Sequence, residues 1–327
     1  MIQAGHRLVL TGTPIENSVS DLWSIMDFLM PGYLGTHETF RRHYEAPLAA
    51  GGFDAEEAQL RLRRKLAPFL LRRLKRDVAR ELPPKIERTA YCTPTPLQKQ
   101  VYRALVETSR QRLETLVAER GFRACAFEVL KTLLQLRQAS CHLDLLHWPD
   151  LPEEGRSAKL DLFFELLDEA LDGGHRLLVF SQFVSMLSIL RRELDARSIP
   201  YAYLDGSTRE RQAEVHRFNA DRSIPLFLIS LKAGGFGLNL TGADMVVHFD
   251  PWWNPAVEQQ ATDRAYRIGQ TRHVYSIKLI ARGTVEEKVL EMQQRKQAVI
   301  DATLDVDQVM LQSLTWEEVR TLMSWEE

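Results

Sequence analysis

The stretch YAYLDGSTRERQAEVHRFNADRSIPLFLISL, residues 201–231, contains one complete unit of the fold. It begins and ends with short apolar runs, and the polar segment between them, RERQAEVHRF, has apolar residues at helical spacing. A continuous apolar run is typical of a strand buried on both faces, and a helix between two such strands is typical of a parallel pair. The stretch therefore predicts a strand, a helix and a second strand of one parallel sheet.

The same alternation of helical patterns and apolar runs continues on both sides of this unit. The further segments are KLDLFFELLDEAL (159–171), RLLVFSQF (176–183), SMLSILRRELDAR (185–197), MVVHFD (245–250), AVEQQATDRAYR (256–267) and VYSIKLI (274–280). We expect an α/β fold in which helices flank a parallel sheet.

The chain before Ser157 is dominated by helical periodicity instead. The helical segments are 18–30, 37–80, 96–119 and 127–141, and the polar segment 147–157 has the composition of a loop. Two short runs, RLVLTG (7–12) and IERTAYC (86–92), have the pattern of strands. A long helix is expected at 284–304, where Thr284 and Glu287 form a capping box.

The bulk composition is that of an ordinary globular protein, with 327 residues, 45% hydrophobic and 26% charged residues and a net charge of -2. No apolar run approaches the roughly 20 residues that span a bilayer, and the opening residues lack a signal peptide's apolar stretch. Three widely spaced cysteines without a CxxC motif predict reduced, buried thiols and no metal site. We expect a cytoplasmic protein, nucleoid-associated if it is bacterial, with no membrane partner.

One segment concentrates positive charge. Residues 61–80 carry nine Lys and Arg side chains against one acid, Asp77. Such a block can bind phosphate groups, or it can be the solvated face of a helix.

A glycine-rich loop follows the run PLFLISL. In KAGGFGLNL (232–240), Gly234, Gly235 and Gly237 would let backbone N–H groups approach a phosphate closely, and Lys232 adds positive charge. The carboxyl ends of parallel strands are where such folds bind ligands. The alternative is a flexible turn.

The segment QQATDRAYRIGQ (259–270) places Arg264 and Arg267 three residues apart, with Gln260 one helical turn earlier. On a helix this spacing puts the side chains on one face. They are either arginine fingers that stabilise charge on a transferring phosphate, or surface ion pairs with acids such as Asp263 or Glu258.

These segments, taken together, resemble the SWI/SNF-type DNA translocases of helicase superfamily two. The whole stretch 228–289 is similar to that family, and motifs in the family's order occur before it. The matching motifs are LVLTGTPIEN (8–17), LLVFSQF (177–183), KAGGFGLNLTGAD (232–244) and QATDRAYRIGQ (260–270), together with the blocks FLLRRLKRDVARELPPK (69–85) and LRQASCH (136–142).

The resemblance implies a RecA-like second helicase lobe and a role for each matching residue. Gln260 and the fingers Arg264 and Arg267 would reach the nucleotide, and Gly234 and Gly235 would lie beside its triphosphate. Residues implied to couple hydrolysis to lobe movement are Thr11, Gly12 and Thr13. Residues implied to contact double-stranded DNA are Ser181, Gln182, Lys232, Asn239 and Trp253, whereas Trp252 is expected to pack internally.

Two parts of the family's machinery are missing from this sequence. No GK pair is present, so there is no P-loop, and the only candidate for an acidic box, Asp168-Glu169, lies in a helical pattern. We therefore expect the chain to be the C-terminal part of a translocase. ATP and Mg²⁺ would bind only together with a complementary first lobe, from the same native chain or a separate one, and the chain alone would not hydrolyse ATP. The alternative is an ATP-inactive nucleic-acid-binding module or gene remnant.

The expected domain order follows from this assignment. Residues 1–95 would be a remnant of the first RecA-like lobe with a helical protrusion, 96–150 a helical protrusion or linker, 151–290 the second lobe, and 291–327 a helical brace with an acidic tail. Because first-lobe strands would lack neighbours, residues 1–20 and 86–92 are expected to be exposed, at an edge, or mobile. A DNA-bound protein is a further possible partner.

Overall fold

The computed structural model divides the chain into two compact units, which are described separately. The structure describes residues 4–11, 19–50, 52–71, 79, 81–152, 154–235, 237–302 and 316–324. Unit 1 comprises Met1–Arg80 with Gln294–Leu314, and unit 2 comprises Glu81–Gln293 with Thr315–Glu327.

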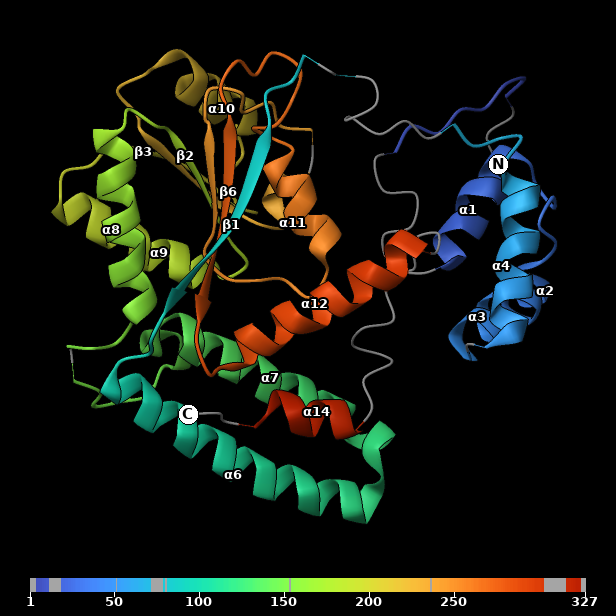
Figure 1. Cartoon of the computed structure of the whole chain (residues 1–327), viewed down its shortest axis with the longest axis horizontal. Coiled ribbons are helices and arrows are strands. Elements are labelled where there is room, and N and C mark those ends of the chain that lie inside the picture. Colours follow the sequence, from blue (N-terminus) through green and yellow to red (C-terminus); the bar gives the residue numbers. More distant parts are fainter. Residues whose placement is uncertain are drawn as a thin grey trace. The chain divides into compact units, whose positions relative to one another are not determined.

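Unit 2 is built on a sheet of six parallel strands in the order β1-β6-β5-β2-β4-β3 (Figure 1). The strands are β1 Lys85–Cys92, β2 Leu177–Ser181, β3 Tyr201–Leu204, β4 Leu226–Ser230, β5 Met245–His248 and β6 Val274–Ala281. The predicted α/β fold is confirmed, and the unit from 201 to 231 is β3, a helix and β4, with β3 and β4 paired in parallel.

The helices of unit 2 follow the predicted segments closely. They are α6 Pro96–Arg120, α7 Ala126–Cys141, α8 Ala158–Asp172, α9 Val184–Ala196, α10 Arg211–Ala220, α11 Pro255–Thr262 and α14 Trp316–Leu322. Helix α12, Val285–Ala302, belongs to unit 2 as far as Gln293. Thr95 caps α6 through a capping box with Gln98. The Asp168-Glu169 pair lies on α8, as the sequence pattern predicted, and not at the end of a strand.

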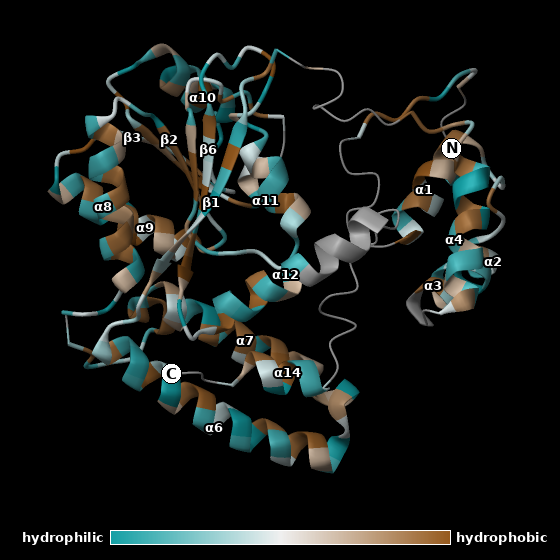
Figure 2. Ribbon diagram, in the orientation of Figure 1, coloured by the Kyte–Doolittle hydropathy of each residue, from teal (hydrophilic) through white to brown (hydrophobic). Residues whose placement is uncertain are grey.

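The sheet is covered on both faces, which explains its apolar strands. On β2, Leu177 and Val179 pack with residues of α8 and α9, whereas Leu178 and Phe180 pack with residues of α10 and α11. Because side chains alternate across a strand, every residue of a doubly covered strand is buried. Figure 2 shows the corresponding concentration of apolar residues in the central strands.

Unit 1 is helical in its described part, as predicted. Its helices are α1 Val19–Leu29, α2 His37–Phe40, a π-helical turn Arg41–Glu45, α3 Ala46–Ala50 and α4 Phe53–Leu66. Their small core includes Leu22, Phe40 and Leu62. Part of the basic block lies on α4, where Arg61 forms an exposed ion pair with Glu57, and residues 72–78 and 80 lie outside the described residues.

The strand predicted at RLVLTG is wrong for its described residues, 7–11. These residues have no strand conformation, and Leu8 and Leu10 are 78% and 87% exposed. The expectation of poor shelter is therefore confirmed there. An apolar run becomes a strand only when a neighbouring strand accepts its backbone hydrogen bonds, and the described part of unit 1 contains none.

The strand predicted at IERTAYC is confirmed, and it belongs to the sheet of unit 2 instead of forming one compact unit with the segments before Glu81. It is β1, and it pairs with β6 from Lys85↔Val274 to Cys92↔Ala281. β1 is the outermost strand on one side of the sheet, as expected of a strand with few neighbours. The unit boundary accordingly falls between Arg80 and Glu81 instead of after residue 95.

A buried histidine on β5 is held in a chain of hydroxyl groups. His248 is 2% exposed, and its Nε2 lies 3.0 Å from Thr262 Oγ1, which lies 3.1 Å from Ser276 Oγ. Burial, the dominant cause, lowers the pKa of His248 to about 4 from its usual 6.5.

This histidine predicts a pH dependence of stability. The folded protein favours the neutral ring, so the unfolded chain takes up the proton first as the pH falls. The contribution of His248 to the free energy of unfolding is fully present above pH 6.5 and is lost as the pH falls toward about 4. The expected loss over this range is about 2–3 kcal/mol. Urea unfolding at a series of pH values should show this loss in the native chain. His248→Gln should lose less over the same window, and equal slopes for the two proteins would contradict the assignment.

Candidate functional site

The predicted polar residues lie where the carboxyl ends of four neighbouring strands meet, and this end of the sheet is called the sheet edge below. Ser181 ends β2 and Gln182 follows it, the glycine loop follows β4, Asp205 follows β3, and Asp250 lies two residues after β5. β2 pairs with both β4 and β5, so these ends are adjacent in space. This edge is where parallel α/β sheets bind ligands.

The glycine loop depends on glycine for two different reasons. A Cβ atom at Gly234 would lie 2.9 Å from Phe180 and 3.3 Å from Ile229, so a larger residue would clash with the core. Gly237 has φ +57° and open space around it, so its requirement is conformational. Gly235 ends the short 3₁₀ turn Ala233–Gly235, and the side chain of Lys232 is exposed.

The two arginines do not lie on a helix, which corrects the sequence-based geometry. Helix α11 ends at Thr262 and carries Gln260, whereas Arg264 and Arg267 lie in the tight turns that follow. The turns are closed by backbone bonds, with Arg264 N–H donating to Ala261 O at 3.1 Å. Helical spacing cannot reveal where a helix stops when the following residues continue in turns.

The arginine turn and the glycine loop are nevertheless bonded to each other. Leu240 N–H donates to Arg264 O at 3.0 Å, and Arg267 Nη1 donates to Leu238 O at 3.1 Å. Gln270 Nε2 donates to Ala243 O at 2.8 Å, a contact that sequence analysis missed. Two loops more than twenty residues apart therefore form one surface.

The charge of this surface suits an anion. Arg264 is 7% exposed; burial first, and the neighbouring charge of Arg267 second, lower its pKa. Two guanidinium groups close enough to perturb each other attract a polyanion such as a triphosphate. Glu258, one of the acids considered as an ion-pair partner, instead binds Lys278 Nζ at 2.6 Å and Trp252 N at 2.7 Å.

Ser181 has a structural role in this conformation. It is 1% exposed, donates to Asp250 Oδ1 at 2.5 Å and accepts from Phe183 N–H at 3.0 Å. Burial raises the pKa of Asp250, and the charge of Arg137 opposes that shift. The burial of Ser181 argues against a direct grip on DNA and assigns it to the corner between strand and loop.

The remaining predicted DNA contacts fall into two groups. Lys232 and Asn239 are exposed residues of the glycine loop. Gln182, which follows β2, is half-buried. Trp253 is only 7% exposed and lies under the Arg137 guanidinium at 5.6 Å, whereas Trp252 is half-buried. The exposures of the two tryptophans are thus the reverse of those expected.

The three predicted coupling residues belong to unit 1. Thr11 is exposed, and Gly12 and Thr13 lie outside the described residues. Because the two units are described separately, none of these three is placed at the sheet edge.

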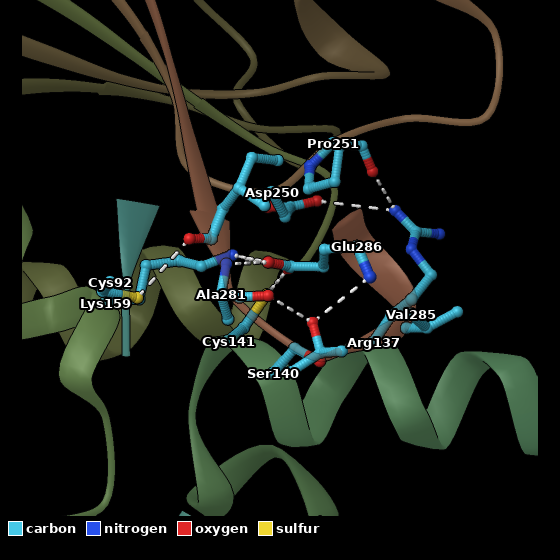
Figure 3. Close-up of polar contacts among 12 residues, drawn as sticks. Cys92, Arg137, Ser140, Cys141, Lys159, Asp250, Pro251, Ala281, Val285 and Glu286 are labelled. Carbon is cyan, nitrogen blue, oxygen red and sulfur yellow. Dashed lines mark hydrogen bonds and ion pairs between the residues drawn. The ribbon is translucent and has the colours of Figure 1, made fainter. Parts of the chain in front are cut away.

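Below the edge lies a buried ionic cluster that the sequence pattern did not reveal (Figure 3). Lys159 of α8 and Glu286 of α12 are each 0% exposed and form an ion pair. Glu286 also accepts from Ala281 N–H at 3.0 Å and from Cys141 Sγ at 3.6 Å. The pair joins α8, α12, the end of β6 and α7 in one place.

The cysteines behave as predicted, since Cys92, Cys125 and Cys141 are all buried and free. Burial raises the pKa of Cys141 well above its usual range. Within the described ranges no group of three or more His, Cys, Asp or Glu side chains could hold a metal ion. Within the same ranges no helix has the length and apolar content needed to cross a membrane.

Comparisons with known proteins agree with this architecture. The SNF2-related domain model matches residues 1–145, and the helicase conserved C-terminal domain model matches residues 158–269. The Sulfolobus solfataricus SWI2/SNF2 ATPase core, solved in complex with double-stranded DNA, is 36% identical with a TM-score of 0.62; the alignment covers 97% of this chain and 66% of that one. The C-terminal domain of the Sulfolobus solfataricus SWI2/SNF2 ATPase is 32% identical with a TM-score of 0.60 and is covered completely, by 74% of this chain.

Longer curated relatives match over almost the whole of this chain. A putative ATP-dependent helicase/translocase of Bacillus subtilis, YwqA, is 38% identical over 95% of this chain and 34% of its own length. Human TATA-binding protein-associated factor 172 is 35% identical over 99% of this chain and 20% of its own length. The chain thus spans between a fifth and about a third of the length of these relatives.

Proposed function

Because the chain belongs to the SWI2/SNF2 family of ATP-dependent helicase-like proteins, we propose that unit 2 is the second ATPase lobe of a duplex-DNA translocase. The lobe supplies Arg264 and Arg267 as arginine fingers and Gln260 as a nucleotide contact. It also supplies half of the track along which DNA moves.

The observation that carries this proposal is the bonded surface of the arginine turn and the glycine loop. The backbone bond from Leu240 to Arg264 and the side-chain bond from Arg267 to Leu238 hold the turn that carries both arginines against the loop that contains the glycines. A triphosphate would fit such a surface, with Gly234 and Gly235 beside its oxygens and the arginines stabilising the charge that develops during hydrolysis.

ATP and Mg²⁺ bind productively in this proposal only when a complementary first lobe is present. That lobe brings a P-loop and an acidic box, neither of which this sequence contains. Thr11, Gly12 and Thr13, in unit 1, would couple hydrolysis to lobe movement. The chain alone is proposed to hydrolyse no ATP.

The DNA track in this proposal uses the exposed side chains Lys232 and Asn239 together with Gln182. The Sulfolobus solfataricus relative was solved with double-stranded DNA, which supports duplex DNA as the partner. Human TATA-binding protein-associated factor 172 is named for its association with the TATA-binding protein, and we propose a DNA-bound protein as a further partner of this chain.

The proposed DNA contact of Lys232 predicts that removing its charge weakens duplex binding. Lys232→Ala should weaken binding to a fluorescent duplex severalfold at low salt and reduce the slope of log K against log salt by about one, since one phosphate contact is lost. Lys131→Ala removes the same charge from α7 and serves as the matched control. Fluorescence anisotropy across a salt series measures both. Identical salt slopes for the native chain and Lys232→Ala would remove this residue from the track.

A nucleic-acid-binding module without catalysis remains the competing function. The exposure of Lys232 and Asn239 is consistent with it. The two functions differ when a first lobe is supplied, because only a translocase lobe then gains DNA-stimulated ATP hydrolysis.

A further inference from the structure

Arg137 lies at the centre of the residues that shape the sheet edge, although it belongs to the helical protrusion. It is the twelfth residue of α7 and is 3% exposed. Its Nη1 donates to Gln182 Oε1 at 3.0 Å. Its Nη2 donates to Pro251 O at 2.5 Å, with Asp250 Oδ2 3.8 Å away (Figure 3). One side chain therefore bonds the segments that follow β2 and β5.

Three aromatic rings surround the same guanidinium. Its Cζ lies 5.8 Å from the ring centroid of Phe183, 5.3 Å from that of Trp252 and 5.6 Å from that of Trp253. These distances are within the range of cation–π attraction. The charge thus holds the tryptophan segment as well as the strand ends.

The bond from Arg137 fixes the orientation of the Gln182 amide. A guanidinium group only donates hydrogen bonds, so it must face the amide oxygen and leave the amide nitrogen pointing elsewhere. Gln182 Nε2 is buried and, within the part of the chain that the structure describes, it has no hydrogen-bond partner. A buried donor without an acceptor costs about 1–3 kcal/mol, which an incoming acceptor would offset.

We infer that Arg137 is a positioning residue for DNA binding: it holds the Gln182 amide so that its unpartnered Nε2, covered in this conformation, donates to a phosphate oxygen once duplex docking uncovers the half-buried side chain. The inference rests on the proposed function, because it deepens the DNA contact made by the second lobe. Phosphate oxygens only accept hydrogen bonds, so the donor end of the amide is the complementary one. Through this contact, α7 and the DNA-facing edge act as one element.

Gln182→Glu tests the donor directly and keeps the Arg137 contact. The carboxylate can still accept from Arg137, so the melting temperature should be unchanged or higher. It has no donor for a phosphate and adds a negative charge, so duplex affinity measured by fluorescence anisotropy should fall tenfold or more. A Gln182→Glu protein that binds the duplex as tightly as the native chain would overturn the inference.

Arg137→Met and Gln182→Ala form a double-mutant cycle with the same readout. If Arg137 acts through Gln182, each single change should weaken duplex binding about five- to thirtyfold. The double variant should then bind no more weakly than the single variant with the lower affinity. Independent, multiplying losses would mean that Arg137 has only a structural role. Arg137→Lys keeps the charge and a single donor nitrogen, so it should retain part of the affinity. It replaces Arg137→Met in the cycle if Arg137→Met is unfolded at the assay temperature.

The control variant Arg112→Met and the native chain distinguish a failure of this inference from a failure of the proposed function. Arg112→Met removes an exposed arginine of α6, whose partner is Glu128, and should leave duplex affinity unchanged. If the native chain does not bind duplex DNA even at low salt, the proposed function fails and the inference fails with it. If the native chain and Arg112→Met bind but Arg137→Met and Arg137→Lys bind equally well, only the inference fails.

Discussion

Replacing Lys159 by methionine is expected to lower the free energy of unfolding by about 3–5 kcal/mol, the cost of leaving a buried charge without its partner. Lys159 and Glu286 are both 0% exposed, so no water can solvate the carboxylate that remains. Glu286 would keep its bonds from Ala281 N–H and Cys141 Sγ, which do not neutralise its charge. Urea unfolding followed by circular dichroism at neutral pH measures the loss.

A second substitution separates the unpaired charge from the loss of packing. In Lys159→Met combined with Glu286→Gln, the neutral amide can still accept from Ala281 N–H, so roughly half or more of the lost stability should return. Arg61→Met, which breaks the exposed pair with Glu57 in unit 1, should cost no more than about 0.5 kcal/mol. A cost below about 1 kcal/mol for Lys159→Met would show that the buried pair contributes little beyond its own desolvation.

The buried pair also shows where sequence analysis stops. In KLDLFFELLDEAL, a lysine at the first turn of an amphipathic helix has the pattern of a solvated residue. Its burial depends on Glu286, which lies 127 residues away. Gln270 is similar, since its bond to Ala243 O is visible only once the two loops meet. Long-range polar contacts between single residues leave no local pattern.

The central strands could be predicted because their burial on both faces is written in the local sequence. RLLVFSQF and PLFLISL became β2 and β4 at the expected places. RLVLTG has a comparable apolar run, yet its described residues form no strand. The difference is the neighbour: β4 pairs with β2 and β3, whereas the described part of unit 1 offers no strand to residues 7–11.

The sequence motifs name candidate residues for the site but do not give their geometry. The glycine loop follows β4 and the arginine turn follows α11, and backbone bonds join the two segments. The helix carrying Gln260, however, stops at Thr262, and this places the arginines in turns. Trp253 and Ser181 are buried because Arg137 and Asp250 engage them, and neither partner could be assigned from spacing alone.

Arg267→Ala is expected to abolish almost all DNA-stimulated ATP hydrolysis in a protein that contains both lobes. Such a protein can be made by joining a first ATPase lobe, with a P-loop and an acidic box, to the start of this chain. Loss of an arginine finger lowers the rate by about 10³–10⁵. Arg267→Lys should recover little, because an ammonium group cannot make the paired, planar contacts of a guanidinium group. Phosphate release at saturating duplex DNA measures the effect.

The surroundings of Arg267 allow a loss of hydrolysis to be distinguished from a loss of folding. Arg267 is half-buried and makes one bond from the side chain to Leu238 O, so its removal should change the melting temperature by a few degrees at most. Arg192→Ala, an exposed change on α9, should leave the rate unchanged. Duplex affinity should stay near that of the parent protein, because Arg267 is not part of the proposed track. If Arg267→Ala instead lost DNA binding and hydrolysis in equal proportion, the side chain would serve the track, and the nucleotide would have to be sensed by another group.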